Sequence, residues 1–511
     1  MFNANNYVLS VVRKFSVRFQ IFIPPQGYVA QRWSEGSSMP SLGILFLAAV
    51  LEKAGIDVEV VPADIMRYTW EDISKRIADF KPDVVGVTTC TENRFDSFKL
   101  VKTAKEVNPN IITVLGGPHI SMVKEDTLIH IKEVDILVIG EGEDTIVELI
   151  RVLEAKDDLS KVKGLYYKND NGKVVFTGFR KRIENLDSLP FPARHLIPME
   201  KYNFYITTRD GKKRRAQNLI TSRGCPFNCY FCSTPVNWGR KMRGHSPERV
   251  LEEIEHLIDR YGAEYIWFYD DTLNYNPTRL HKIMDMIIER KLNIKFTSEF
   301  RLDVVDKPLL EKMMRAGLEL GSFGIEAGNS RVRKNIVKKN FDIELAYQFL
   351  KWSKEFDFIP GPFFIFSHYT ETWEEAQETI KVMEKVKSIN PQADISTAIL
   401  HIYPGTPLEI IAKEEGIIPD GFSWSKKEDM KRVYTLPAAQ GHVPLFKHKL
   451  TWWQIADLVM RWSTASKKGI SPSKIKQSIT SLTGINDIFI NVIFFLAFLK
   501  YKLIKLFKRM E

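Results

Sequence analysis

The 511-residue chain contains only four cysteines and no long uncharged apolar run. Four thiols cannot staple a secreted protein of this length, so we expect a reducing compartment and take the cytoplasm as the location. No apolar run precedes the first expected strand, which argues against a signal peptide. No internal repeat is found, and hydrophobic and charged fractions of 44% and 27% exclude collagen-like, mucin-like and disordered chains. Most of the chain should fold into globular domains.

The positive charge of the chain is concentrated in two clusters. The formal net charge of +10 leaves nucleic acid, an anionic cofactor and a membrane surface open as partners. The clusters consist of Lys212, Lys213, Arg214 and Arg215, and of Lys500, Lys502, Lys505, Lys508 and Arg509. The first lacks the interleaved aromatic residues of a surface that stacks on bases, so we interpret it as a solvated or phosphate-facing loop.

Short β-branched runs alternate with helical patterns in the first third of the chain. The expected strands are 17–23, 58–61, 84–88, 111–115 and 136–139, and the expected helices are 41–54, 70–80, 95–107, 124–131 and one from Thr145. This alternation predicts an α/β fold with a doubly wound, Rossmann-like parallel sheet. Ligands bind such sheets beyond the carboxyl ends of the strands.

A second alternating region predicts a full or partial (β/α) barrel of the TIM type, with strands at 218–221, 265–269, 295–299, 320–325, 361–366 and 394–402. Length alone suggests roughly three folding units. We expect an N-terminal extension over 1–16, the Rossmann-like domain over 17–155 and a linker with a hairpin over 156–215. The barrel is expected over 216–425, and a helical C-terminal region that ends in an amphipathic helix over 426–511.

Three of the four cysteines lie within eight residues. Cys225, Cys229 and Cys232 are spaced by four and three, and Gly224, Pro226 and Asn228 in the same segment favour a loop. Such a loop can place three thiolates round one face of an iron–sulfur cubane and leave the fourth iron open. The alternative is a structural zinc, which needs four protein ligands, and the remaining Cys90 lies in another expected domain.

The segment resembles the CxxxCxφC signature of the radical S-adenosylmethionine superfamily, with Phe231 as the aromatic residue. The resemblance implies a [4Fe–4S] cluster, held by the three cysteines, that cleaves S-adenosylmethionine to a 5′-deoxyadenosyl radical. It also implies a reducing electron donor such as flavodoxin or ferredoxin. The protein would supply orientation and exclusion of water.

Polar residues at the ends of the expected barrel strands fit the same resemblance. They are expected to bind the cofactor, and they are Asp270, Asp271, Glu299, Arg301, Glu326, Pro404 and Gly405, together with Phe231. Arg301 suits a carboxylate, and Glu326 suits a ribose hydroxyl. Each residue taken singly can also be read as a solvated charge at a strand end, because loops often carry such residues.

The joining of a doubly wound domain to such a barrel resembles the cobalamin-binding class of these enzymes over residues 17–420. The expected cobalamin contacts are Ser41, Gly43, Thr89, Gly116, Gly117, His119, Gly140, Glu141 and Gly142. Glycines would let the backbone approach the cofactor closely. Residues 24–40 contain no histidine, so the resemblance implies a base-off, histidine-off cobalamin. We interpret Cys90 as a buried structural thiol rather than a cobalt ligand.

With both cofactors present, the expected reaction is methylation of an unactivated carbon in a hydrophobic small-molecule substrate. Radical cyclisation or carbon–carbon coupling on a lipid or tetrapyrrole is an alternative, because one architecture supports several reactions. A non-catalytic cobalamin carrier or sensor would leave the three-cysteine loop without a purpose. A tRNA methylthiotransferase would need three more cysteines in the N-terminal domain, so nucleic acid is not an expected partner.

The C-terminal segment suggests contact with a membrane surface. Residues 488–499 are nearly all apolar, but about twelve residues fall short of the roughly twenty that span a bilayer. Basic residues follow this run, as in an interfacial helix whose cationic end meets anionic head groups. The alternative is a terminal helix packed on the protein's own core. A peripheral position on the cytoplasmic face of the membrane would favour a lipid or tetrapyrrole substrate.

Overall fold

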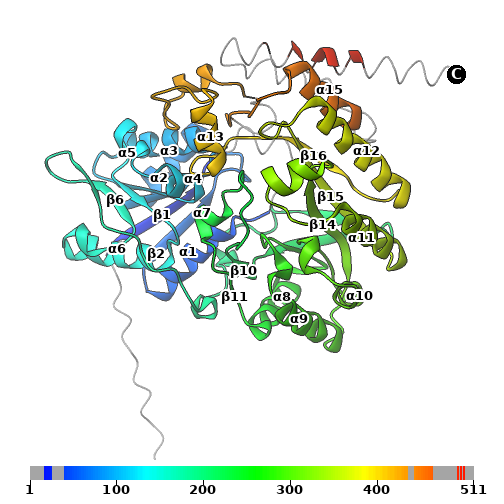
Figure 1. Ribbon diagram of the computed structural model, residues 1–511. Helices are drawn as coiled ribbons and strands as arrows, with labels where there is room; N and C mark the ends of the chain where they lie inside the picture. The colour runs from blue at the N-terminus through cyan, green and yellow to red at the C-terminus, as the bar shows by residue number, and fades with distance from the viewer. Residues whose placement is uncertain are drawn as a thin grey trace, which may run out of the picture.

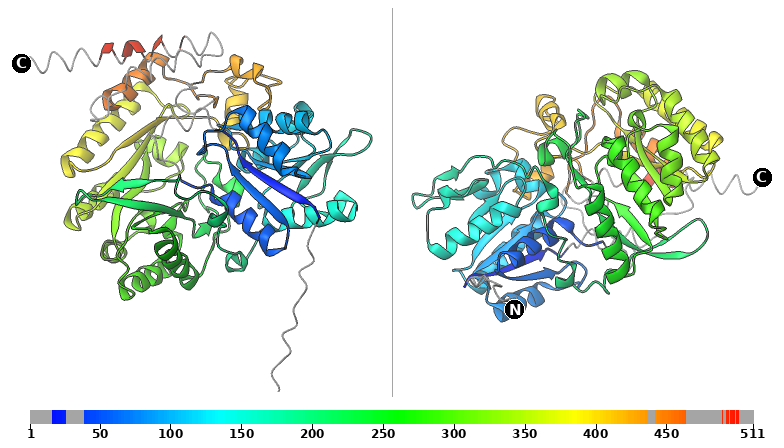
Figure 2. Two further views of the ribbon diagram at one scale, coloured as in Figure 1. Left: turned by 180° about the vertical axis from the view of Figure 1, so that it is seen from behind. Right: turned by 90° about the horizontal axis from the view of Figure 1, so that it is seen from below.

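The computed structural model describes residues 16–25, 39–435, 442–463 and, near the C-terminus, 489, 492, 493, 495–497, 499 and 500. Two α/β domains lie side by side, one blue to cyan and the other green to yellow in Figure 1. Figure 2 shows the same pair from behind and from below, with the orange C-terminal segments crossing one end of both domains. Segments that are far apart in the sequence therefore lie beside one another in the fold.

The first domain is built on a seven-stranded sheet in the order β2-β1-β3-β4-β5-β6-β7. Its strands are β1 (Arg18–Ile23), β2 (Asp57–Pro62), β3 (Val84–Thr88), β4 (Ile112–Gly116), β5 (Ile136–Val138), β6 (Leu165–Lys168) and β7 (Val174–Phe176). The first five are parallel, and β6 and β7 add an antiparallel hairpin to the edge. The chain reverses its direction of winding between β1 and β3, which is where open α/β sheets bind ligands.

Helices cover both faces of this sheet because its strands are apolar on both sides. Phe19 and Ile21 of β1 pack under α1 (Leu42–Lys53) and α6 (Glu143–Ala155). Phe22, on the opposite face of the same strand, packs with four other helices. These are α2 (Trp70–Phe80), α3 (Arg94–Val107), α4 (Pro118–Val123) and α5 (Asp126–His130).

The helix expected over 124–131 is wrong in its bounds. The structure has two short helices, α4 and α5, separated at Lys124, whose φ is 54°. Pro118 lies in the first turn of α4, where its missing N–H and fixed φ favour helix initiation. Helix formation therefore begins six residues before the expected start, and the left-handed Lys124 ends it.

The second domain is an open, curled sheet of seven strands in the order β16-β15-β14-β13-β12-β9-β8. They are β8 (Tyr205–Thr207), β9 (Lys213–Leu219), β12 (Tyr265–Phe268), β13 (Lys295–Glu299), β14 (Leu318–Glu326), β15 (Ile359–Phe366) and β16 (Ser396–Ile399). All are parallel except β8. The barrel is partial because β16 and β8 form the two edges of the sheet and do not pair with each other. The segment 156–215 thus supplies an edge hairpin to the first sheet and an edge strand to the second.

Five helices pack against the convex side of the curled sheet and close its hydrophobic core. They are α8 (Pro247–Tyr261), α9 (Pro277–Glu289), α10 (Lys307–Arg315), α11 (Ile343–Glu355) and α12 (Trp373–Ile389). Helix α13 (Pro407–Glu414) follows the last strand, and α15 (Trp452–Ser463) packs beside α12. The segments that follow β9 and β16 contact the first domain.

The described part of the C-terminal segment packs on α15. Ala497 is fully buried against Ala456 and Met460, and the Nζ of Lys500 lies 2.8 Å from Asp457. The basic residues 502–509 lie outside the described residues. Among the helices that the structure describes, none is both long and apolar enough to cross a bilayer.

Candidate functional site

The three-cysteine loop begins where β9 ends and short strand β10 (Ser222–Arg223) turns away from the sheet. Gly224 has a φ of 105°, and a Cβ there would collide with the carbonyl oxygen of Lys241, so only glycine fits. The Cys225 N–H donates to the Gly239 carbonyl at 3.1 Å, and the Cys232 N–H donates to the Cys229 carbonyl at 3.1 Å. Backbone contacts therefore hold the loop in a compact form.

The thiols of this loop are partly exposed and affect one another electrostatically. Burial raises the pKa of Cys229 to about 11 and also raises the pKa of Cys232. Loading iron must then release protons, because the thiolate is the metal ligand. In the described residues no three His, Cys, Asp or Glu side chains are arranged to hold a single metal ion. The resemblance gives each thiol a different iron of one cluster.

Asp270 lies beneath the start of the loop. Its carboxylate accepts hydrogen bonds from the Thr221 N–H at 3.0 Å, from the Thr221 hydroxyl at 2.7 Å and from the Ser222 hydroxyl. Arg279 donates to the Thr221 carbonyl at 3.0 Å. Burial raises the pKa of Asp270, although these donors lower it. Asp270, which was predicted to bind the cofactor, is therefore buried and supports the start of the cysteine loop.

The other predicted charged residues at strand ends lie near the cysteine loop and interact electrostatically with one another. The side chains of Asp271 and Glu299 reach solvent, but the surrounding protein atoms partly desolvate the Asp271 carboxyl group. This desolvation, together with the charges of Asp270 and Glu299, raises the pKa of Asp271 to about 6. Arg301 lies over the Phe227 ring, 3.5 Å from its centroid, and donates two hydrogen bonds to Asp303. A cationic side chain thereby stacks on the cysteine loop itself.

Lys339 is a site residue that the sequence reasoning missed. It is nearly buried, and its Nζ lies 2.6 Å from Glu326 and 2.9 Å from the Gly324 carbonyl. Glu326 has a φ of 66°, and its second carboxylate oxygen is buried with no hydrogen-bond partner. The Lys339 charge also acts on Cys229 and Glu299. Nothing in the loop sequence Lys338-Lys339-Asn340 distinguishes this lysine from an exposed one.

Residues between the cysteines are anchored to the strand ends as well. The Tyr230 hydroxyl lies 3.1 Å from His368 Nδ1 and accepts a hydrogen bond from the Tyr369 N–H. Phe231, the aromatic residue of the signature, contacts the His368 ring at a centroid distance of 6.2 Å. Burial lowers the pKa of His368 to about 3, so the ring is neutral near pH 7. The loop is therefore fixed on both sides.

A cavity of about 290 Å³ opens at the carboxyl ends of β1, β3, β4 and β5 in the first domain. Its walls include seven of the predicted cobalamin contacts, namely Ser41, Gly43, Gly116, Gly117, Gly140, Glu141 and Gly142. Nothing lies within 4 Å of a Cβ built at Gly43 or Gly140, so these glycines border open space. Phe19 and Ile21 form its apolar floor. The cavity is therefore a slot bordered by glycines, which can admit a narrow group.

The remaining predicted contacts lie behind this cavity or beside it. His119 is buried, with Nδ1 3.1 Å from the Thr91 hydroxyl and its ring against Trp424, and it is not on the cavity wall. Thr89 is also buried, and its hydroxyl has no hydrogen-bond partner. Cys90 lies on the wall, and burial raises the pKa of its thiol to about 12. No histidine lines this cavity among the residues described.

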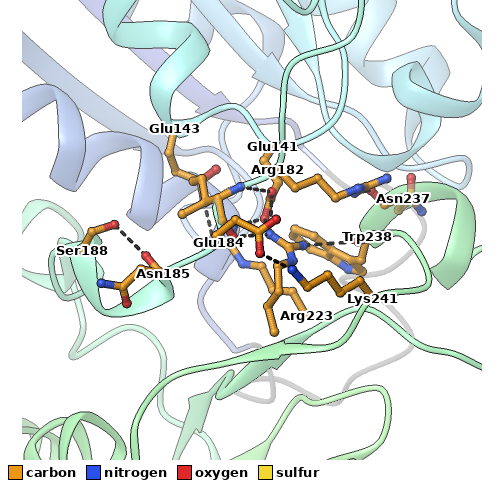
Figure 3. A network of polar contacts seen from close by, with 12 residues as sticks. Glu141, Glu143, Arg182, Glu184, Asn185, Ser188, Arg223, Asn237, Trp238 and Lys241 are labelled. Carbon is orange, nitrogen blue, oxygen red and sulfur yellow. Dashed lines mark hydrogen bonds and ion pairs between the residues drawn. The ribbon is translucent and has the colours of Figure 1, made fainter.

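A buried ion network joins the two domains beside the cavity (Figure 3). Arg223 pairs with Glu141 at 2.9 Å and with Glu143 at 2.6 Å, and Arg243 pairs with Glu141 at 2.8 Å. Although burial raises the pKa of Glu141, the two guanidinium groups outweigh it and hold that pKa below its usual value. The Arg223 guanidinium lies 4.9 Å from the centroid of Trp238.

The loop after β16 also reaches the first domain. The Tyr403 hydroxyl donates to Glu92 at 2.8 Å, and Gly405 packs beside Met122 and Val236. The predicted residues Pro404 and Gly405 therefore lie at the domain boundary. Arg94 of α3, which is fully buried, donates to the carbonyl of Trp424 at 2.8 Å. The site is closed by contacts from three separate parts of the chain.

Comparison with known sequences assigns the two domains. A profile described as the B12 binding domain matches residues 34–150, and one described as the Radical SAM superfamily matches residues 219–383. The chain is 34% identical over 392 residues to an uncharacterized methyltransferase of Pyrococcus horikoshii, and the alignment covers 77% of this chain and 82% of the relative. It is 29% identical to the cytidylyl-2-hydroxyethylphosphonate methyltransferase of Streptomyces wedmorensis, covering 70% and 74%.

Comparison with solved structures agrees on the fold. The radical S-adenosylmethionine methyltransferase TsrM from Kitasatospora setae, with cobalamin and a [4Fe-4S] cluster bound, superimposes with a TM-score of 0.71. The match covers 94% of this chain and 99% of that protein at 16% sequence identity. The arrangement of the two domains is therefore that of a solved fold.

Proposed function

The chain belongs to the radical S-adenosylmethionine enzymes that carry a B12-binding domain, and from this membership we propose that it methylates an unactivated carbon of a hydrophobic substrate. Its cofactors are a [4Fe–4S] cluster, S-adenosylmethionine and cobalamin. The relatives of Pyrococcus horikoshii and Streptomyces wedmorensis are described as methyltransferases. These descriptions support methyl transfer ahead of a non-catalytic carrier.

One observation carries the proposal. Asn237 and Trp238, from α7 (Thr234–Trp238) of the second domain, line the cavity of the first domain. The next residue, Gly239, accepts the hydrogen bond from the Cys225 N–H at 3.1 Å. A single three-residue stretch therefore touches both the cavity and the cysteine loop. Two cofactors held at these places would lie next to each other, as a reaction that uses both requires.

The residues present fit both groups. Cys225, Cys229 and Cys232 would hold the cluster, and the glycine-edged slot with its apolar floor would receive the nucleotide portion of cobalamin. When bound, the cluster would supply the electron that cleaves S-adenosylmethionine, and cobalamin would supply the methyl group. Because no histidine lines the slot among the described residues, and residues 24–40 contain none in the sequence, we propose that cobalamin binds in its base-off, histidine-off form.

The charged residues of the barrel would orient S-adenosylmethionine. Arg301 and Lys339 offer cations for its carboxylate, and Asp271 and Glu299 offer carboxylates for its amino group. Glu326 has one buried oxygen without a partner, which suits a ribose hydroxyl. The domain contacts at Tyr403 and Arg94 would exclude water from the space between the cofactors.

The test is an anaerobic reconstitution with iron, sulfide and hydroxocobalamin, followed by reaction with S-adenosylmethionine that carries a labelled methyl group. We expect stoichiometric cobalt beside about four irons in the protein peak. Membrane-lipid and tetrapyrrole fractions are then screened for the label. A methyltransferase of this kind should form both S-adenosylhomocysteine and 5′-deoxyadenosine. Formation of 5′-deoxyadenosine alone, with a ring-closed and unlabelled product, would contradict methyl transfer.

The C-terminal segment supports a hydrophobic substrate met at a membrane surface. Ile493 and Ala497 face α15, whereas Phe489, Val492, Phe495, Leu496 and Leu499 are exposed. An exposed apolar face next to a basic run suits an interfacial helix. A chain shortened to end at Thr483 should then bind anionic liposomes more weakly than the full chain. Equal binding would remove this support for a lipid substrate.

A further inference from the structure

A basic surface lies on the outer side of the cysteine loop. It is formed by Lys163, Phe179, Lys181 and Arg182, which border an open hollow of about 470 Å³, together with Arg240 and Lys241. We name these six residues the basic face. Figure 3 shows two of them, Arg182 and Lys241, next to the residues of the ion network. Arg182 links this surface to the cavity, because it donates to the carbonyl of Asn237 on the cavity wall, whereas Lys163, Lys181, Arg240 and Lys241 are exposed.

The basic face is in direct contact with the loop that carries the cysteines. Arg240 donates to the Phe227 carbonyl at 3.3 Å and to the Asn228 side chain. Arg182 donates to the Asn237 carbonyl at 2.6 Å and its guanidinium packs over Gly239. The Gly239 carbonyl in turn accepts from the Cys225 N–H. Gly239 therefore links the Arg182 guanidinium to Cys225, which is a predicted ligand of the cluster.

Charge on this face is predominantly positive. Five of its six residues are basic, and the acidic groups beside them are Glu184, which pairs with Lys241 at 2.5 Å, and Asp144. Arg180, at the same hollow, is paired with Glu148. Lys163, Lys181, Arg240 and Lys241 are exposed. An excess of positive charge on an exposed face attracts a negatively charged partner over a distance and speeds its association.

Phe179 gives this face an apolar centre. Its side chain is 68% exposed and packs edge-on against Phe176. Exposed aromatic and arginine side chains are enriched where proteins bind one another. A small contact with an aromatic centre and charged surroundings is typical of weak, short-lived electron-transfer complexes.

We propose that the basic face is the docking site of a small acidic protein that carries a low-potential one-electron carrier. The inference rests on the proposed function, because it requires a [4Fe–4S] cluster at Cys225, Cys229 and Cys232. The donor loses one electron and the oxidised cluster gains it, with no bond made or broken. Because Arg240 contacts Phe227 and Asn228 in the cysteine loop itself, docking here gives the electron a short path to the iron.

The test measures cluster reduction rather than methyl transfer. Reconstituted full-length protein is mixed with reduced flavodoxin, or with reduced ferredoxin, in a stopped-flow spectrophotometer, and the loss of cluster absorbance gives a second-order rate constant. The variants are Lys163→Glu combined with Lys181→Glu, and Phe179→Ala. The matched control is Lys212→Glu combined with Lys213→Glu, which makes the same charge change on the exposed β8–β9 hairpin. Dithionite, a small inorganic reductant, is the second control.

We expect the double variant of the basic face to lower the rate constant with at least one of the two proteins by about tenfold or more at low salt. Phe179→Ala should lower it less, and the hairpin control should leave it unchanged. Added salt should slow the wild type strongly and the double variant weakly, because salt screens exposed charges. Dithionite should reduce every variant at the wild-type rate.

Equal rates for the basic-face variant and the hairpin control would overturn the proposal. Failure of both donor proteins to reduce a wild-type cluster that dithionite reduces would also overturn it. A protein that takes up no cluster would instead contradict the proposed function. Absence of labelled product with intact donor kinetics would leave this docking site standing.

Discussion

Arg223 and Glu141 form an ion pair 2.9 Å long across the boundary between the two domains, and the side chains are only 3% and 4% exposed. Arg223 directly precedes Gly224 and Cys225, whereas Glu141 lies on the wall of the cavity in the first domain. The pair therefore ties the position of the cysteine loop to the position of the cavity. Arg243 reinforces it by binding the same carboxylate.

Removing one partner of this pair should destabilise the protein. Arg223→Met leaves Glu143 buried without its cation and Glu141 with Arg243 alone, and a broken buried pair costs about 3–5 kcal/mol. The matched control is Arg290→Met, which breaks the exposed pair with Glu255 at 3.5 Å. An exposed pair contributes about 1 kcal/mol or less. Thermal unfolding of the reconstituted proteins measures the difference, and equal melting temperatures would show that the network does not hold the domains.

The cysteine loop should be the source of all iron binding. We expect Cys225, Cys229 and Cys232 replaced together by alanine to reduce bound iron from about four atoms per chain to nearly none. Cleavage of S-adenosylmethionine should be lost with it. Cys90→Ala is the control, because Cys90 lies in the other domain on the cavity wall. Iron and sulfide quantification after reconstitution decides this, and retained iron in the triple variant would refute the assignment.

Filling the slot should block cobalamin without harming the fold. Gly43 lies in the first turn of α1, and a Cβ built there meets nothing within 4 Å. Leucine forms helices better than glycine, so Gly43→Leu should not lower the melting temperature of the cobalamin-free protein. Its side chain would occupy the slot and weaken hydroxocobalamin binding by about tenfold or more.

Gly43→Ala is the matched control for this substitution, because a single methyl group leaves most of the slot open. Titration followed by visible absorbance gives both affinities. Unchanged binding by the leucine variant would mean that cobalamin does not enter the slot at this end.

A buried carboxyl group predicts a pH dependence of stability. Glu371 is fully buried, one of its oxygens accepts from the N–H groups of Ser367 and His368, and burial raises its pKa from 4.5 to about 8. Between these values the folded protein keeps the proton and the unfolded chain releases it. Stability should therefore fall as the pH rises from about 4.5 to 8.

Glu371→Gln should remove this contribution, so the variant should gain stability relative to the wild type as the pH rises from 6 to 8. The control is Glu375→Gln. The hydrogen bond from Arg331 lowers the pKa of Glu375, so that residue is ionised in both states over this range. Melting temperatures at pH 6, 7 and 8 measure the effect, and parallel curves for the Glu371→Gln variant and the wild type would contradict it.

The fold was largely readable in the chain because its signals are local. The predicted strand 84–88 and helix 70–80 match β3 and α2 in full, since a run of buried valines and a threonine cap with Asp72 act within a few residues. The two helices in place of 124–131 were not foreseen, because Pro118 starts α4 upstream of the apolar run. The first and last residues of a helix or strand depend on such competition between neighbouring residues more strongly than its existence does.

The candidate site divides in the same way. The spacing of Cys225, Cys229 and Cys232 and the glycines at the strand ends were visible in the sequence, because a loop round a cluster and a close backbone approach need particular residues at particular intervals. Lys339 and the partners of Arg223 were not visible. Lys339 lies 13 residues from Glu326 and Arg223 lies 82 residues from Glu141, and only folding brings each pair together.

The sequence by itself thus determined which chemistry the chain carries: two α/β domains, one cysteine loop and one glycine-edged set of strand ends. The tertiary structure alone decided how these parts meet. It placed Trp238 on the wall of the cavity and Gly239 against Cys225, and it buried Arg223 between two carboxylates. The physical reason is that motifs are local in the chain, whereas the burial that fixes their separation depends on contacts between distant residues.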